Sequence, residues 1–168
     1  MAITTEQIKA LREETGAGVM DAKRALEAAN GDAAKAKAIL REQGIAAAAK
    51  RSERETSNGV VEAYIHGGGR VGVLVEVNCE TDFVANTDDF RALAKNVAMQ
   101  IAAMSPVLIS KDDPDRAKHE GSDEEVCLMS QPFIRDSSRT IEQLVQDAVA
   151  KTGENIRVRR FTRFELGR

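Results

Sequence analysis

Residues 60–66 (VVEAYIH) and 71–77 (VGVLVEV) are two runs with a period of two, joined by glycines at 67–69. The second run places four valines on one face: Val71, Val73, Val75 and Val77. The first run does the same with Val61, Ala63 and Ile65. Two alternating runs joined by glycines predict an antiparallel β-hairpin at the centre of the chain.

Segments with helical periodicity follow the hairpin. Residues 87–104 and 139–152 each carry an apolar stripe that recurs every three or four residues. The last run, 156–166, alternates again and predicts a third strand. The predicted fold class is therefore α+β, and residues 58–168 form a three-stranded antiparallel sheet packed with helices.

Residues 1–44 have a different pattern, which predicts a module of three short helices. Gly16 ends the first helix, Asp32 caps the third, and Gly44 ends it. A module of this size buries little apolar surface, so we expect it to dock on a partner as well as on the rest of the chain. Residues 45–57 are interpreted as a linker whose first turns can continue as helix.

Composition and charge disfavour several classes of protein. The net charge is −3 and the pI is near 5.5, whereas a domain that binds duplex nucleic acid is normally strongly basic. No apolar run reaches the roughly 18 residues of a membrane span, and the first ten residues lack the pattern of a secretory signal. We therefore expect a cytoplasmic protein that makes no contact with membranes.

His66, Cys79 and Asp82 are the residue types of a thiol nucleophile with a base and an orienting carboxylate. The predicted hairpin separates them, because the His66 and Cys79 positions lie about 25–30 Å apart at about 3.3 Å per residue. We therefore predict that the protein is not an enzyme and that Cys79 is a small buried thiol. Cys79 and Cys127 form no C-x-x-C pair, so no metal site is predicted.

The glycine runs at 16–18 and 67–69 lack the context of a phosphate-binding loop, and no nucleotide or other cofactor is predicted. The C-terminal run RVRRFTRFELGR mixes arginines with aromatics, as in surfaces that bind single-stranded RNA. The other interpretation is a strand whose arginines face water or acidic groups: Arg157, Arg159 and Arg163. Because the chain is acidic overall, we favour this interpretation and expect no direct nucleic-acid binding, with an RNA-binding module as the alternative function.

Residues 78–86 (NCETDFVAN) place Phe83 directly after a polar Thr81-Asp82 pair. A lone phenylalanine is most often buried, and Asp82 would then simply cap a turn. Alternatively, Phe83 is exposed at a strand-to-helix corner, where functional residues are often displayed on a rigid scaffold. Met20, beside a Gly-Ala-Gly turn, has the same two interpretations. The residue pattern leaves both questions open.

Two long stretches, LREETGAGVMDAKRAL (11–26) and VGVLVEVNCETDFVA (71–85), closely resemble the bacterial elongation factor Ts family. QPF at 131–133 and GENIRVRRFTRFELG at 153–167 add to the resemblance. It implies a guanine-nucleotide exchange factor for the translational GTPase elongation factor Tu, in its GDP-bound and nucleotide-free states. The first module would then be similar to a ubiquitin-associated (UBA) domain.

The resemblance also implies two sets of contact residues. The first module would dock on the nucleotide-binding domain of elongation factor Tu through Arg12, Val19, Met20 and Lys23. Position 19 is often Met in members of the family. Thr81-Asp82-Phe83 would be inserted near the magnesium and phosphate site, with Phe83 as the wedge and Asp82 as a polar contact. Disturbing that site would release GDP.

Longer members of the family carry two tandem hairpin–helix units, and this sequence contains one. It resembles the short form, which pairs two copies to rebuild the double core. We therefore predict a homodimer with the hairpin and the terminal strand near the two-fold axis. The segment 107–130 is shorter than the corresponding insert of the family, so a contact made there is expected to be absent or altered.

Overall fold

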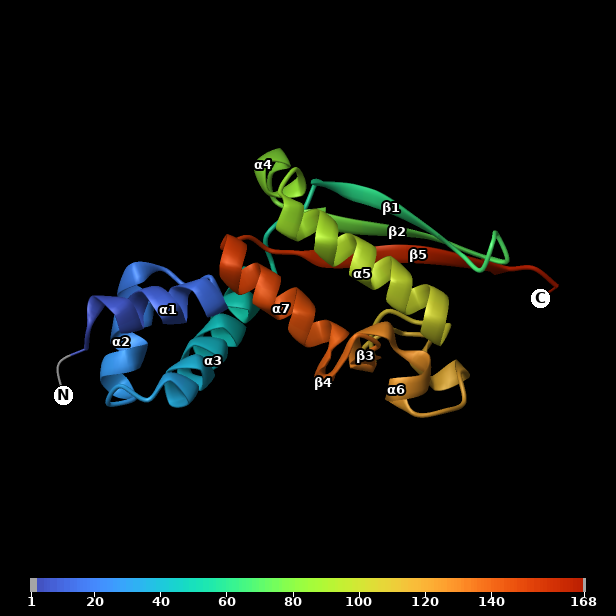
Figure 1. Ribbon diagram of the computed structural model, residues 1–168. Helices are drawn as coiled ribbons and strands as arrows, with labels where there is room; N and C mark the ends of the chain where they lie inside the picture. The colour runs from blue at the N-terminus through green and yellow to red at the C-terminus, as the bar shows by residue number, and fades with distance from the viewer. Residues whose placement is uncertain (1–2, 168) are drawn as a thin grey trace.

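The computed structural model describes residues 3–167, with a three-helix module at one end and a sheet that runs to the other (Figure 1). The module comprises α1 (Thr5–Thr15), α2 (Val19–Ala28) and α3 (Ala33–Arg51). Gly16 ends α1 with a φ of 70°, as predicted. The module has a small core of its own, made of Leu11, Ala22, Ala25, Leu26, Ala29 and Ala36.

The prediction that α3 ends at Gly44 is wrong, because the helix continues to Arg51. Residues 45–51 (IAAAAKR) have high helix propensity, and this part of α3 packs against α7 (Ile141–Thr152). A Cβ at position 44 would lie 2.9 Å from the Cβ of Ala150 in α7, so glycine permits the close approach of the two helices. Only residues 52–57 connect the module to the sheet as non-helical chain.

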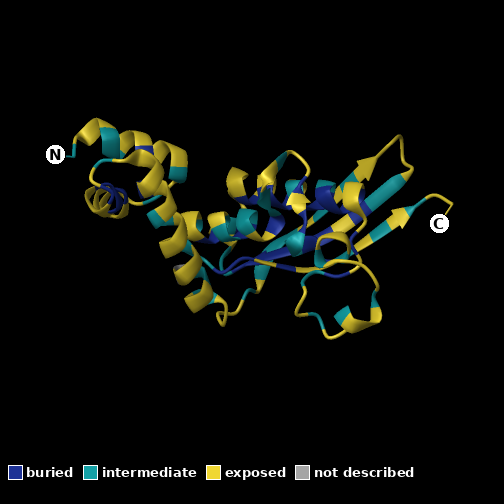
Figure 2. Cartoon of the chain, turned by 90° about the horizontal axis from the view of Figure 1, so that it is seen from below, coloured by how far each residue is buried: buried dark blue, intermediate teal, exposed yellow. Residues whose placement is uncertain are grey.

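The sheet has the order β1-β2-β5 and is antiparallel throughout, which confirms the predicted α+β class. Its strands are β1 (Asn58–His66), β2 (Val71–Cys79) and β5 (Arg157–Glu165). Helices α5 (Asp88–Met104) and α7 cover one face (Figure 1). Figure 2 shows buried residues concentrated between this face and α5. They include Val73, Val75, Val77, Phe90, Leu93, Val97 and Ile101.

The opposite face of the sheet carries apolar side chains that no helix within residues 3–167 covers. Val61 and Ile65, which share a face as the alternation indicated, lie on this side and are 67 % and 66 % exposed. Val60 and Tyr64 face the core instead. We call this surface the outer sheet face; by register it comprises Val61, Ala63, Ile65, Gly72, Leu74, Glu76, Arg160, Thr162 and Phe164.

The segment between α5 and α7 is made of short elements. It contains α6 (Asp123–Val126), two 3-10 turns (Arg116–Lys118 and Leu128–Ser130), and a small ladder of β3 (Pro132–Phe133) and β4 (Asp136–Thr140). The Arg116 guanidinium donates hydrogen bonds to the carbonyls of His119 and Gly121 and to the Asp123 carboxylate. Among residues 3–167, no helix combines the length and apolar character needed to span a membrane.

Candidate functional site

The chain turns sharply between β2 and α5, and we call residues 80–86 the corner. Thr81 caps α4 (Asp82–Ala85), a helix of four residues, and its hydroxyl oxygen accepts a hydrogen bond from the Val84 amide. Ala85 is buried, which ties the inner side of α4 to the core. Phe83 points the other way and is 82 % exposed, so the interpretation of Phe83 as a core residue is wrong. Asp82 beside it is exposed as well.

Thr81 is held by a residue that the sequence analysis did not single out. The Glu154 carboxylate accepts hydrogen bonds from the amides of Glu80 (3.1 Å) and Thr81 (3.0 Å), and from the Thr81 hydroxyl (2.6 Å). Thr81 is therefore half-buried and faces inward, whereas Asp82 and Phe83 face solvent. Glu154 lies 73 residues away in sequence from Thr81, and a carboxylate after a helix gives no local signal of such a partner.

The predicted residues of the first module lie around the start of α2. Met20 is 61 % exposed and Val19 is 50 % exposed, so Met20 is a surface residue. The Arg12 side chain donates to the carbonyl of Ala17 and holds the turn between α1 and α2. Lys23 forms an ion pair with Glu27 at 3.8 Å. We call Arg12, Val19, Met20 and Lys23 the first-module surface.

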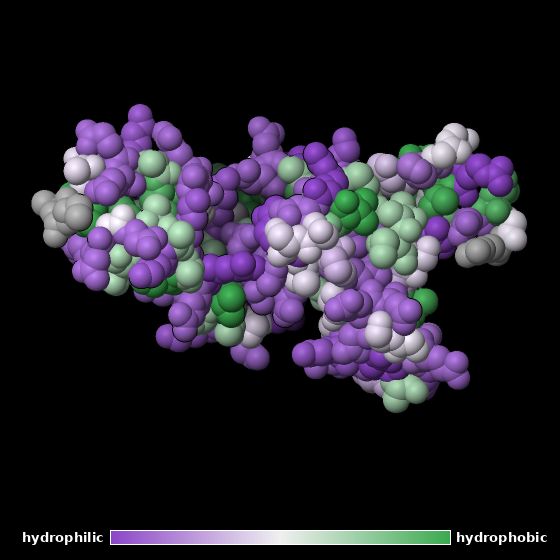
Figure 3. Space-filling model, turned by 60° about the horizontal axis from the view of Figure 1, so that its bottom comes forward, coloured by the Kyte–Doolittle hydropathy of each residue, from purple (hydrophilic) through white to green (hydrophobic). Residues whose placement is uncertain are grey.

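The structure does not bring the first-module surface and the corner into a single site. One lies on the module and the other at the end of β2 (Figure 1). Between the module and the sheet domain lies a cleft of about 710 Å³, and Figure 3 shows a hollow with mainly hydrophilic walls there. The cleft contains an ion pair of Lys151 with Asp89 at 2.6 Å.

The enzyme-like trio is separated as predicted. His66 pairs with Val71 beside the glycine turn, and Cys79 pairs with Asn58 at the opposite end of the hairpin. Burial and the nearby Glu154 carboxylate raise the pKa of Cys79 to about 11, so its thiol is protonated at neutral pH. Within the described chain, no group of three or more His, Cys, Asp or Glu side chains is placed to hold a metal ion.

Three arginines of strand β5, Arg159, Arg160 and Arg163, are paired with acceptors of their own chain. A register shift opposite Glu76 and Val77 lets both Arg159 and Arg160 reach the Glu76 carboxylate, at 3.3 and 2.7 Å. Arg163 donates to the carbonyl of Ala102 and to Glu165. The two aromatics of the strand are divided, because Phe161 packs on the core and Phe164 lies on the outer sheet face. They do not form one stacking surface.

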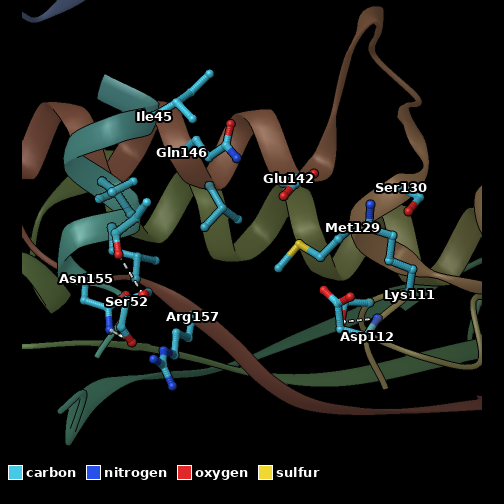
Figure 4. Close-up of a pocket in the computed structure, with 16 residues that line it drawn as sticks. Ile45, Ser52, Lys111, Asp112, Met129, Ser130, Glu142, Gln146, Asn155 and Arg157 are labelled. Atoms are coloured by element: carbon cyan, nitrogen blue, oxygen red, sulfur yellow. Dashed lines mark hydrogen bonds between the residues drawn. The ribbon is translucent and has the colours of Figure 1, made fainter. Parts of the chain in front are cut away.

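A pocket of about 400 Å³ lies between the last turns of α3, α7 and residues 110–112. Figure 4 shows Asn155 and Ser52 at one end of it and Lys111 and Asp112 at the other. Between these polar ends, part of its wall is apolar, with Ala48, Met129, Val145 and Val149. None of the predicted contact residues lines this pocket.

Comparison with known proteins identifies the family. Residues 5–124 and 118–168 match the family described as Elongation factor TS. Proteins named Elongation factor Ts from Carboxydothermus hydrogenoformans and Heliobacterium modesticaldum are each 50 % identical over 98 % of this chain and 89 % and 90 % of their own length. The one from Leptospira biflexa is 48 % identical over 99 % of both chains.

These relatives are longer than this chain within the aligned region. The alignment with the Carboxydothermus protein has 194 positions, so at least 26 of them (194 less 168) have no residue here. The two segments of the family match meet at residues 118–124, inside the segment that the sequence analysis described as shortened. With both ends and the centre of the chain matched, the protein belongs to the elongation factor Ts family.

Proposed function

We propose that this protein is a non-enzymatic guanine-nucleotide exchange factor for elongation factor Tu, in which Phe83 acts as a wedge near the magnesium and phosphate site. The observation that carries the proposal is the 82 % exposure of the Phe83 ring on a corner that is anchored to the core. A large exposed aromatic is unusual on a surface that has no partner, and aromatic anchors dominate many protein interfaces. Family membership supplies the identity of the partner.

The free energy available from burial of Phe83 shows why the wedge needs further contacts to weaken GDP binding. Each tenfold loss of GDP affinity requires about 1.4 kcal/mol of coupling free energy. Burial of one Phe side chain supplies roughly 1.5–3 kcal/mol, or one to two powers of ten. A larger loss of GDP affinity requires that the first-module surface and other contacts also bind the nucleotide-free GTPase more tightly than the GDP-bound GTPase. By reciprocity, GDP must weaken the binding of this protein by the same factor.

The first-module surface is proposed as the docking contact for both the GDP-bound and the nucleotide-free GTPase. Met20 and Val19 supply exposed apolar area on α2. Lys23 lies on the same helix, and Arg12 lies on the neighbouring helix α1. Because this surface is remote from the corner, it can hold the partner before and after GDP leaves. Loss of its contacts should therefore weaken binding in both nucleotide states.

The test is the release of fluorescent GDP from elongation factor Tu with and without this protein. We expect the wild-type protein to accelerate release and Phe83→Ala to lose about one to two powers of ten of that acceleration. Met104→Ala is the matched control, because Met104 is an exposed apolar residue at the far end of α5. Release that is no faster with the wild-type protein would refute the proposed function. A fully active Phe83→Ala variant would refute the wedge alone.

We also propose that two copies pair through the outer sheet face. Its end near the glycine turn is apolar, with Ile65, Leu74 and Phe164 exposed by 66 %, 48 % and 70 %. Its other end carries Glu76 with Arg159 and Arg160. Monomeric proteins rarely expose a contiguous apolar patch of this kind, and a second copy covers it by two-fold symmetry. The predicted solution mass is twice 18.2 kDa.

A further inference from the structure

The turn after α7 binds the corner through one side chain. Gly153 ends α7 in the left-handed conformation, and Glu154 follows it. All three hydrogen bonds that the Glu154 carboxylate accepts come from Glu80 and Thr81, the first two residues of the corner. Because the Thr81 hydroxyl donates a hydrogen bond to Glu154, its oxygen is oriented to accept a hydrogen bond from the Val84 amide. Glu154 thereby sets the cap of the helix that carries Phe83.

The next residue of the same turn binds the connection to the first module. Asn155 is 5 % exposed, and its side-chain amide donates to the carbonyls of Ser52 (3.3 Å) and Arg54 (2.8 Å). Figure 4 shows Asn155 directed at Ser52, where α3 ends. The Asn155 backbone amide donates to the Glu80 carboxylate at 2.6 Å, and Glu80 also pairs with Arg54 at 3.4 Å. One turn therefore joins the corner and the connecting segment.

We propose that Glu154 is a positioning residue for Phe83. The inference rests on the proposed function. A helix of four residues does not hold its shape without external hydrogen bonds, so α4 depends on its cap for its orientation. A ring that is 82 % exposed has few contacts of its own to hold it in place. The wedge is effective only when its base is rigid.

The first experiment compares Glu154→Ala with Glu154→Gln. Alanine leaves two amides and the Thr81 hydroxyl without their acceptor. We expect the maximal acceleration of GDP release to fall about tenfold or more, while the half-saturating concentration changes by less than about threefold, because docking through the first-module surface is intact. Glutamine keeps one oxygen that can accept from both amides, and its amide can donate to the Thr81 oxygen. The Glu154→Gln variant should therefore restore most of the maximal acceleration of GDP release.

A double-mutant cycle with Phe83→Ala separates positioning from general stability. If Glu154 acts through Phe83, adding Glu154→Ala to Phe83→Ala should cost less than about twofold further. An equal loss in both backgrounds would overturn the proposal. Glu142→Ala is the matched control, since it removes an exposed carboxylate from the first turn of α7 and should leave the rate unchanged.

Amide hydrogen exchange of the free protein tests the same inference without the GTPase. Glu154→Ala should raise exchange at the hydrogen-bonded amides of residues 84–86 about tenfold or more while the amides of β2 stay protected. Unchanged protection of α4 would overturn the inference, whatever the nucleotide assay shows. If Glu154→Ala does not fold, Glu154→Asp draws the carboxylate one methylene away from its three donors, leaves Thr81 in place, and should show a loss of protection and of maximal rate in the same direction. Wild-type protein that fails to accelerate release would instead refute the proposed function.

Discussion

At the residue scale, burial decides the chemistry of the two cysteines. Cys79 and Cys127 are both free and buried. The Cys79 thiol donates a hydrogen bond to the carbonyl of Thr81 at 3.1 Å, at the base of the corner. A thiol in this position packs as a small apolar group and is not poised for reaction. Its environment leads to two predictions.

The first prediction concerns thiol reactivity. Burial raises the pKa of both thiols above their ordinary values, for Cys79 to about 11. A disulfide reagent such as DTNB at pH 8 should therefore label the native protein at least about a hundredfold more slowly than the protein in denaturant. Labelling of either cysteine in the native protein at the rate of the denatured one would contradict its burial.

The second prediction concerns pH and stability. Because the pKa of Cys79 is about 11 in the folded protein against 9.0 ordinarily, the folded state holds this proton more tightly than the unfolded state does. The contribution to stability is complete below about pH 9 and is lost as the pH rises through about 11. Urea denaturation at pH 8, 9 and 10 should show a smaller decrease in unfolding free energy for Cys79→Ser than for the wild type. Equal pH dependence would contradict the prediction.

At the element scale, one glycine sets the distance between α3 and α7. Glycine inside a helix normally costs about 1 kcal/mol relative to alanine, so Gly44→Ala would stabilise α3 if no neighbour interfered. The added Cβ would lie 2.9 Å from the Cβ of Ala150, and relief of such overpacking costs about 1–3 kcal/mol. A double-mutant cycle of Gly44→Ala with Ala150→Gly should show a favourable coupling of similar size in urea denaturation. Additive effects would contradict the contact.

A buried amide network ties α5 to the segment that follows it. Gln100 is fully buried; its side chain donates to Gln131 and to the carbonyl of Pro132, and it accepts from the amide of Ile134. Gln100→Ala should lower the unfolding free energy by about 2–4 kcal/mol, through lost hydrogen bonds and a cavity. Gln100→Met, which keeps the volume, separates the two causes. A methionine variant as stable as the wild type would show that the hydrogen bonds contribute little.

At the scale of the whole molecule, the outer sheet face should control the oligomeric state. Ile65→Glu places a charge on an exposed strand position, so the monomer should keep its stability within about 0.5 kcal/mol. In the proposed dimer that charge is buried, and light scattering should show the mass falling to 18.2 kDa. Val107→Glu, at another exposed apolar position, is the control that should remain dimeric. An Ile65→Glu protein that stays dimeric would place the interface elsewhere.

Local patterns in the sequence were sufficient for most elements of the fold. Asp32 caps α3 and Gly16 ends α1, as the sequence predicts, because a helix cap is satisfied by groups within three or four residues. The hairpin follows equally from alternation and glycines. The sequence also showed the motif around Phe83, but it did not show whether the Phe83 side chain is exposed.

Tertiary structure decided what depends on residues far apart in the chain. Alternation put Val61 and Ile65 on one face, and only the position of α5 showed that this face is the outer one. A lone glycine often marks the end of a helix, and the sequence therefore suggested that α3 ends at Gly44. The structure shows instead that glycine is needed there because Ala150 of α7 packs closely against it. Glu154 and Thr81 meet only after the sheet domain has folded. Sequence determines periodicity and caps because these are local, whereas burial and long-range hydrogen bonds require the packed molecule.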